Sequence, residues 1–165
     1  MVKITALTEE TAPVGTDILA IVDDPSVTPI TKKTTISNLL KVKPEFISIA
    51  LGDESTVLAA ASTTVPVVSF HMPYGFVLTD VKVGCTVAPT GAALLTVDVH
   101  EAGTTILSTK VTVDASEKTS GTATTPPVIS DANLAEDALI EVFVDQLDTD
   151  NVAAGVKLYL IGYQA

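Results

Sequence analysis

The chain is poor in aromatic and sulfur-containing side chains. Trp is absent, aromatic residues make up 4% of its 165 residues, and Cys85 is the single cysteine. One cysteine excludes an intramolecular disulfide and a zinc site made of several cysteines. In the strand-like segment "VKVGCTV" we expect Cys85 to be a small buried apolar side chain. The absence of Trp also argues against a sugar-binding cleft lined by aromatic rings.

Basic side chains are scarce as well. Nine Lys and Arg residues stand against twenty Asp and Glu, so the formal net charge is −11 and the sequence pI is about 4.3. A nucleic-acid-binding surface needs basic residues to neutralise phosphates. We therefore expect no nucleic-acid partner. The acidic excess indicates a soluble, self-repelling surface instead.

Long apolar runs are also missing. Asp, Lys, Gly or Pro interrupts each run well before the roughly 18 residues that a membrane-spanning helix requires. The N-terminal "MVKITALTEE" lacks the apolar core of a secretory signal, so we expect neither export by that route nor membrane insertion. Yet hydrophobic residues make up 47% of the chain and the mean hydropathy is +0.45. Apolar surface beyond one small core predicts a subunit interface, and hence a homo-oligomer.

Val, Ile, Leu, Ala and Thr are abundant, and this composition favours pleated sheets. Apolar and polar positions alternate in residues 95–100, 141–145 and 156–161. The positions predicted to face away from the core are Thr96, Asp98, His100, Glu141, Phe143, Asp145, Lys157, Tyr159 and Ile161. One dry and one wet face, repeated over about eight strands, predicts an all-β, antiparallel, jelly-roll-like sandwich. The pair Ala102–Gly103 predicts a tight hairpin turn.

The residue pattern of the chain changes near Pro44. Residues 1–44 contain an apolar strand, a Thr/Lys strand and the short helical segment "TTISNLLK", for which Ser37 is the predicted N-cap. Pro44 disfavours helix in the residue before it and so ends this part. We therefore predict a small hairpin and short-helix segment at 1–44 and the sandwich at 45–165. The first segment is too small to bury a core of its own.

The sequence offers little catalytic chemistry. The two histidines, His71 and His100, lie in predicted strands, and Ser69 shares a strand face with His71 without a nucleophile motif around it. There is no glycine-rich phosphate or dinucleotide loop. Asp98 and Glu101 lie on one strand but point to opposite faces, which does not suit a pair of glycosidase carboxylates. We expect a non-enzymatic protein without a cofactor.

One acidic cluster is a candidate metal site. The segment "DQLDTDN" places Asp145, Asp148, Asp150 and Asn151 at a strand end, and calcium binds oxygen ligands of this kind. The glycine and terminal glutamate of an EF-hand loop are missing. We therefore expect an acidic turn without a bound metal, and calcium binding at Asp148, Asp150 and Asn151 is the alternative.

Residues 3–41 carry the pattern "ALTE…P…D.L.IVD……TKK.T..NLL". This pattern resembles the N-terminal segments of tailed-bacteriophage structural proteins, and the remainder resembles a β-sandwich module of phage virions. The resemblance implies a trimer on the surface of a virion made in the host cytoplasm. It also implies attachment to other virion proteins through residues 1–44. The attachment residues would be Asp17, Ile18, Leu19, Ile21, Val22, Ile36, Leu39 and Leu40.

Two virion roles follow from this resemblance. A tail-fibre subunit is the leading hypothesis, and a head (capsid) decoration protein is the alternative. Exposed loops on a rigid sheet often carry recognition, so the loops at 72–75, 114–127 and 148–151 are candidates for contact with a host surface. Solvated connectors are the other interpretation. The candidate contact residues are Tyr74, Lys118, Thr119 and Asp150.

Overall fold

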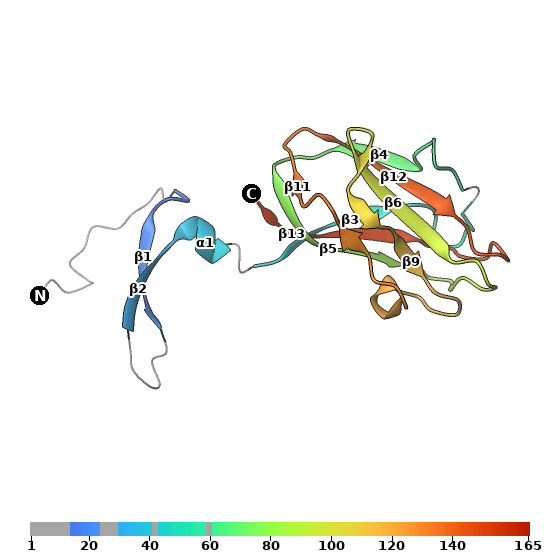
Figure 1. Cartoon of the computed structure of the whole chain (residues 1–165), viewed down its shortest axis with the longest axis horizontal. Coiled ribbons are helices and arrows are strands. Elements are labelled where there is room, and N and C mark those ends of the chain that lie inside the picture. Colours follow the sequence, from blue (N-terminus) through green and yellow to red (C-terminus); the bar gives the residue numbers. More distant parts are fainter. Residues whose placement is uncertain (1–13, 24–29, 41–42, 59–60) are drawn as a thin grey trace, which may run out of the picture. The chain divides into compact units, whose positions relative to one another are not determined.

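The computed structural model describes residues 14–23, 30–40, 43–58 and 61–165 (Figure 1). The chain divides into two compact units, Met1–Lys43 and Pro44–Ala165. The boundary falls directly before Pro44. Within the described ranges, no helix has the length and apolar character needed to cross a membrane.

The first unit is a hairpin followed by one short helix. Strand β1 (Ile18–Asp23) pairs antiparallel with β2 (Ile30–Thr35), and α1 (Ile36–Leu40) follows without a gap. The Thr35 hydroxyl accepts a hydrogen bond from the Asn38 N–H at 3.2 Å, so Thr35 caps this helix. The predicted N-cap at Ser37 is wrong, because β2 runs directly into the helix and leaves Ser37 inside it.

The second unit contains two main antiparallel sheets. One has the strand order β11-β5-β13-β3, and the other has the order β4-β12-β6-β7, with β9 also paired to β6. A smaller sheet joins β8 to β10. The bounds are β3 Glu45–Ala50, β4 Val68–His71, β5 Phe76–Gly84, β6 Leu95–Glu101, β7 Thr104–Thr105, β8 Leu107–Thr109, β9 Val111–Val113, 3₁₀ helix η2 Ser120–Thr122, β10 Val128–Ile129, β11 Asn133–Leu134, β12 Leu139–Gln146 and β13 Lys157–Gln164.

The chain crosses repeatedly from one main sheet to the other. It passes from β3 to β4, from β4 to β5 and from β5 to β6, and it crosses again between β11, β12 and β13. As a result β13 lies between β3 and β5, and β12 lies between β4 and β6. This is the strand order of a jelly roll. The predicted all-β antiparallel sandwich is confirmed.

Aliphatic side chains from the two main sheets form the core. On β6, Leu95, Val97 and Val99 are each 0% exposed, as their alternation predicted. The same holds for Leu158 and Leu160 on β13. Every residue of the buried cluster lies between Leu51 and Leu160, inside the second unit. Among the described residues, the buried cluster of the sandwich is thus made of residues of the second unit.

The turn between β6 and β7 is the predicted tight hairpin. Glu101 pairs with Thr104, and the two residues between them, Ala102 and Gly103, have φ values of 49° and 81°. Positive φ at both central positions is the type I′ geometry that matches the twist of two paired strands. The register of the two strands follows from this turn.

Candidate functional site

Apolar side chains of the hairpin are exposed on both faces of β1. Ile18 is 61% exposed and its neighbour Leu19 is 38% exposed. Because successive strand residues point to opposite faces, neither face is covered at this end of β1. On α1, Leu39 is 50% exposed. The first unit thus presents apolar side chains that nothing within the described part of that unit buries.

Asp17 has a structural position beside these side chains. Its carboxylate accepts the Val14 N–H at 2.8 Å, and its carbonyl accepts the Ile36 N–H at 3.0 Å. Asp17 and Ile36 are both half-buried, so this pair holds the start of β1 against the start of α1. The remaining residues predicted for attachment have side chains outside the described part of the chain: Ile21, Val22 and Leu40.

A buried carboxylate lies on the outer face of β6, where the alternation predicted a wet surface. Asp98 is 1% exposed. Its Oδ1 accepts hydrogen bonds from the Thr105 hydroxyl at 2.6 Å and from the Val99 N–H at 2.8 Å. Its Oδ2 lies 3.0 Å from Lys110 Nζ and 3.2 Å from His100 Nε2. The predicted wet face is wrong here, because side chains from adjacent segments cover it.

Lys110 connects this carboxylate to a third segment. It lies between β8 and β9 and forms a second ion pair with Asp145 on β12. The Asp145 side chain is 10% exposed and that of Lys110 is 41% exposed. Phe143, predicted to face water, is 5% exposed, and its ring centroid lies 4.4 Å from that of His100. These contacts tie β6, β12 and the β8–β9 link together.

The cluster favours the charged forms of its two central groups. Burial acts to raise the pKa of Asp98, but the hydrogen bonds from Thr105 and Lys110 and the Lys110 charge outweigh it and lower that pKa. The hydrogen bond with Asp145 is the main cause that raises the pKa of Lys110. In a Ser-His-Asp triad the histidine lies between hydroxyl and carboxylate. Here Thr105 bonds directly to Asp98, so the arrangement is an Asp98–Lys110 ion pair with supporting hydrogen bonds.

The acidic turn after β12 is fixed by its own carboxylates. Asp148 is 3% exposed, and its Oδ2 accepts the N–H groups of Thr90 and Val152, each at 3.1 Å. Asp150 Oδ2 accepts the Thr90 hydroxyl at 2.8 Å. Asn151 adopts a φ of 48° and donates its N–H to the Asp148 carbonyl at 3.0 Å. The turn is thereby anchored to the loop that contains Thr90.

Asp145 is separate from this turn because it pairs with Lys110. Among the residues that the structure describes, no group of three or more His, Cys, Asp or Glu side chains is placed to hold a metal ion. Calcium binding at Asp148, Asp150 and Asn151 stays the untested alternative to an acidic turn without a metal.

The proposed recognition residues lie at opposite ends of β5. Tyr74 precedes the start of β5, where its hydroxyl donates to Glu45 Oε2 at 3.4 Å. Partial burial and the Glu45 carboxylate raise the pKa of Tyr74. Lys118 and Thr119 lie beside the other end, where the Lys118 carbonyl accepts the Cys85 N–H at 2.9 Å. Asp150 accepts a hydrogen bond from Thr90, which follows that second end along the chain. The structure therefore does not bring the four residues into one surface.

His71 and Cys85 have local structural partners. His71, on the edge strand β4, is exposed, and its Nδ1 lies 2.8 Å from the Asp137 carbonyl. Cys85 is half-buried and packs against the core, so it is less buried than predicted. Burial raises the pKa of the Cys85 thiol.

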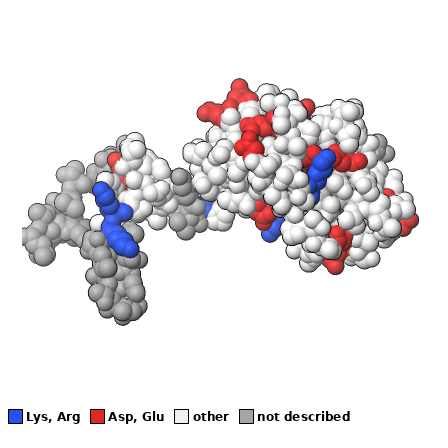
Figure 2. All heavy atoms as spheres, in the orientation of Figure 1, with Lys and Arg blue, Asp and Glu red and all other residues white. Residues whose placement is uncertain are grey.

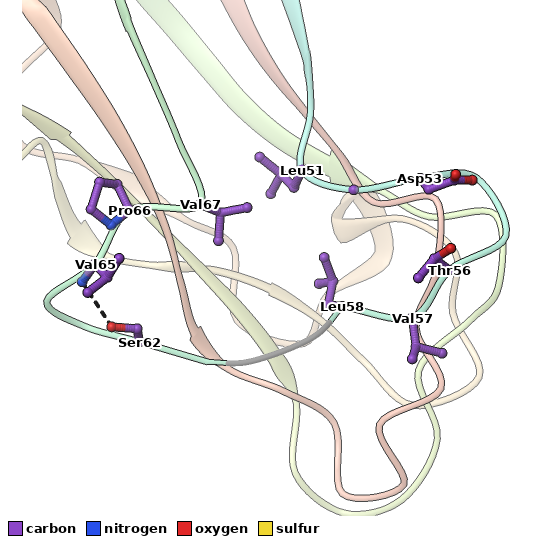
Figure 3. Close-up of a pocket in the computed structure, with 10 residues that line it drawn as sticks. Leu51, Asp53, Thr56, Val57, Leu58, Ser62, Val65, Pro66 and Val67 are labelled. Atoms are coloured by element: carbon purple, nitrogen blue, oxygen red, sulfur yellow. Dashed lines mark hydrogen bonds between the residues drawn. The ribbon is translucent and has the colours of Figure 1, made fainter.

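Apolar hollows occur on the described part of the sandwich. A pocket of about 560 Å³ lies between the segment that follows β3 and the segment that precedes β4 (Figure 3). Its lining residues are Leu51, Gly52, Asp53, Thr56, Val57, Leu58, Ser62, Val65, Pro66 and Val67. A second hollow of about 340 Å³ lies on the outer face of β3 and β13. It is lined by Pro44, Glu45, Phe46, Tyr159 and Ile161.

The charge of the chain is unevenly divided. Residues 1–43 contain five acidic residues and five lysines, whereas residues 44–165 contain fifteen acidic residues and four lysines. The whole net charge of −11 therefore belongs to the second unit. Acidic side chains outnumber lysines on the visible face of that unit (Figure 2).

Comparisons of the chain with protein-family models, with curated proteins and with solved structures found no match.

The Asp98 cluster is the feature that the sequence analysis missed. Two signals pointed to it: an aspartate in the middle of the apolar strand "TVDVH", and one lysine in the otherwise uncharged stretch "TTILSTKVTV". A charge at such a position is expected to be paired when it is buried.

Proposed function

We propose that this chain is a non-enzymatic structural protein of a tailed-bacteriophage virion. In this proposal the hairpin segment, residues 1–44, joins the chain to another virion protein, and the sandwich lies on the particle surface. The observation that carries the proposal is the exposure of Ile18 and Leu19 on opposite faces of β1. A two-stranded hairpin is marginal by itself. Its apolar side chains are therefore suited to docking.

The resemblance of residues 3–41 to phage N-terminal segments supports the same role. The buried cluster of the sandwich contains no described residue of the first unit, which fits an appendage that can dock elsewhere. A tail-fibre subunit, with three copies per assembly, is the leading form of the proposal. The sandwich would then be the exposed or linking part of the fibre.

A head-decoration protein is the second candidate. The chain is short for a complete receptor-binding fibre, and it contains no Trp and only three Tyr for contacts with glycans. The four recognition residues also lie at two ends of the sandwich, which does not favour a single receptor-binding tip. Copy number separates the two roles, since a decoration protein follows the capsid lattice and a fibre subunit does not.

The test is incorporation into particles that lack this protein. Deletion of residues 1–41 is expected to leave a folded sandwich that no longer joins the particle. Ile18→Asp in the full chain should also reduce incorporation, because a carboxylate replaces an exposed apolar contact. Val128→Asp is the matched control, since Val128 is 49% exposed on the sandwich. Normal incorporation of the truncated chain would contradict the attachment role.

A further inference from the structure

Strand β3 forms an open edge of its sheet. It lies at the end of the order β11-β5-β13-β3 and pairs only with β13 among the described strands. It has six residues, whereas the other ends of the two main sheets, β11, β4, β7 and β9, have two, four, two and three. A long edge strand exposes a row of unpaired backbone groups that another strand can bind.

The sequence of β3 protects this edge only at its start. Proteins usually protect such edges with charges, proline or a bulge. Pro44 precedes the strand and Glu45 begins it, but the remaining residues, Phe46–Ala50, include no charged residue and no proline. Its pairing with β13 runs from Glu45 to Ala50 without a shift in register. Within the described sandwich, the edge is therefore suited to strand addition from Phe46 to Ala50.

The hydrogen-bonding phase of β3 shows which groups point outward. The Leu51 N–H donates to the Val156 carbonyl at 2.8 Å, and these two residues continue the β3–β13 register. Hydrogen-bonded pairs alternate along an antiparallel ladder. Ile47 and Ile49 thus direct their backbone groups toward β13. Phe46, Ser48 and Ala50 direct theirs away from the sheet.

The side chains of β3 show the same lack of cover. Phe46 is 67% exposed on the outer face, beside the 340 Å³ hollow. Ile47 and Ile49 point toward the core but are only partly buried. On the next strand, Leu158 and Leu160 are each 0% exposed. One more strand beside β3 would cover both isoleucines as β3 itself covers β13.

We propose that this strand is β3 of a second copy of the chain, paired antiparallel about a two-fold axis at Ser48. This register places Phe46 opposite Ala50 of the second copy, and Ser48 opposite Ser48. The outward N–H and C=O groups of all three residues are then paired. A large aromatic side chain lies opposite a methyl group, so the two copies fit without steric conflict. Ile47 lies opposite Ile49 of the second copy on the core side.

Charge along the paired strands does not oppose a second copy in this register. The sandwich carries the net charge of −11, so two copies repel each other over most of their surface. Glu45 lies opposite Leu51 of the second copy, and hence no like charges face each other along the strand.

This contact goes beyond the proposed virion role and does not depend on it. A two-fold axis is not the three-fold axis of the expected trimer. This interface would therefore join two copies in addition to the contacts that form the trimer. Equal strands contacting through the same surface form a closed, isologous interface.

The first test measures the mass of the full chain by light scattering during size-exclusion chromatography. We expect wild-type assemblies with an even number of copies. Ser48→Lys should at least halve the mass, because two ammonium groups would lie opposite each other on the two-fold axis. Ser69→Lys is the matched control, an exposed serine on edge strand β4, and should leave the mass unchanged. A monomeric wild type, or an assembly that Ser48→Lys does not alter, would overturn the proposal.

The second test uses a cysteine at the two-fold axis. Facing Cα atoms of a hydrogen-bonded antiparallel pair are about 5.5 Å apart, within disulfide range. In a full chain with Cys85→Ala, Ser48→Cys should form a reducible cross-link between two copies. Ser69→Cys in the same background should not. Lack of the Ser48→Cys cross-link, or equal cross-linking at both positions, rejects this register.

Discussion

Asp98 joins three segments of the sandwich through one carboxylate. Its two oxygens contact Thr105, Val99 N–H, His100 and Lys110 while 1% of the residue is exposed. Hydrogen bonds to a buried charged group each contribute more to stability than neutral ones. We therefore expect this carboxylate to stabilise the fold in its ionised form.

Asp98→Asn tests this expectation. The amide keeps the shape but removes the charge that faces Lys110, and we expect a loss of about 2 kcal/mol in the free energy of unfolding at pH 7. Urea denaturation measures it. Asp80→Asn is the control, because Asp80 pairs with Lys82 on the surface and should change stability by less than about 0.5 kcal/mol. Equal effects of the two substitutions would contradict a special role for Asp98.

The same pair of proteins gives a pH dependence. Since the folded-state pKa of Asp98 is lowered, its contribution is fully present above the unfolded-state pKa of about 3.9. It is lost as the pH falls through the lowered folded-state pKa. The stability difference between wild type and Asp98→Asn should be constant near neutral pH and shrink below about pH 4. A difference that grows on acidification would contradict the assigned direction.

At the scale of single residues, the sequence predicts the direction of a side chain better than it predicts which groups cover that side chain. Alternation placed Leu95 and Val97 in the core correctly. It could not show that Lys110, twelve residues after Asp98, returns to cover that carboxylate. Covering depends on strand pairing between distant segments, which period-two patterning does not encode. The cap at Thr35 was missed for a local reason, since it depends on the residue at which β2 ends.

Among the elements, β13 contains the irregularity that most restricts its sequence. The pairing of β13 with β5 shifts in register between Ile161 and Gly162. A side chain at Gly162 would collide with the Val77 carbonyl and lie 2.8 Å from Phe76 Cε1. The glycine lets these two central strands approach at the bulge.

Gly162→Ala is therefore expected to destabilise the sandwich by about 3 kcal/mol, because a backbone carbonyl cannot move aside as a flexible side chain can. Thermal denaturation followed by circular dichroism measures the effect. Gly121→Ala is the matched control. Its added methyl would meet only the Thr119 hydroxyl at 3.4 Å, so we expect less than about 1 kcal/mol of change. A neutral Gly162→Ala would show that β13 and β5 can separate at low cost.

The strands were predictable as elements, but their partners were only partly so. Alternating segments such as "LTVDVHE" identify strands, and Ala102–Gly103 identifies the β6–β7 turn. The pairing of β13 with β3, more than one hundred residues earlier, has no local signal. For the same reason the sequence could not show that Tyr74 and Asp150 lie near opposite ends of β5.

For the whole molecule, the two units have different physical characters. The hairpin unit is neutral in formal charge and exposes apolar side chains, whereas the sandwich is strongly acidic and contains the whole buried cluster. The stability of the sandwich should therefore not depend on the hairpin.

A chain of residues 44–165 should unfold within about 4 °C of the sandwich transition in the full chain, which corresponds to roughly 1 kcal/mol or less. Differential scanning calorimetry at equal concentration and salt measures both. A larger drop would mean that the hairpin contributes to the fold of the sandwich. Because oligomer formation also raises the transition temperature, Ser48→Lys in both lengths serves as the control.

The open edge at β3 has a consequence for growth. Pairing two four-stranded sheets through β3 gives one continuous sheet of eight strands whose outer limits are the two copies of β11. Each of these has only two residues, and Asp131 and Asn133 lie beside or within it. Such a short end offers little backbone for a third chain. Strand addition thus stops at two copies, because the edge most prone to fibril growth is already paired in the contact between them.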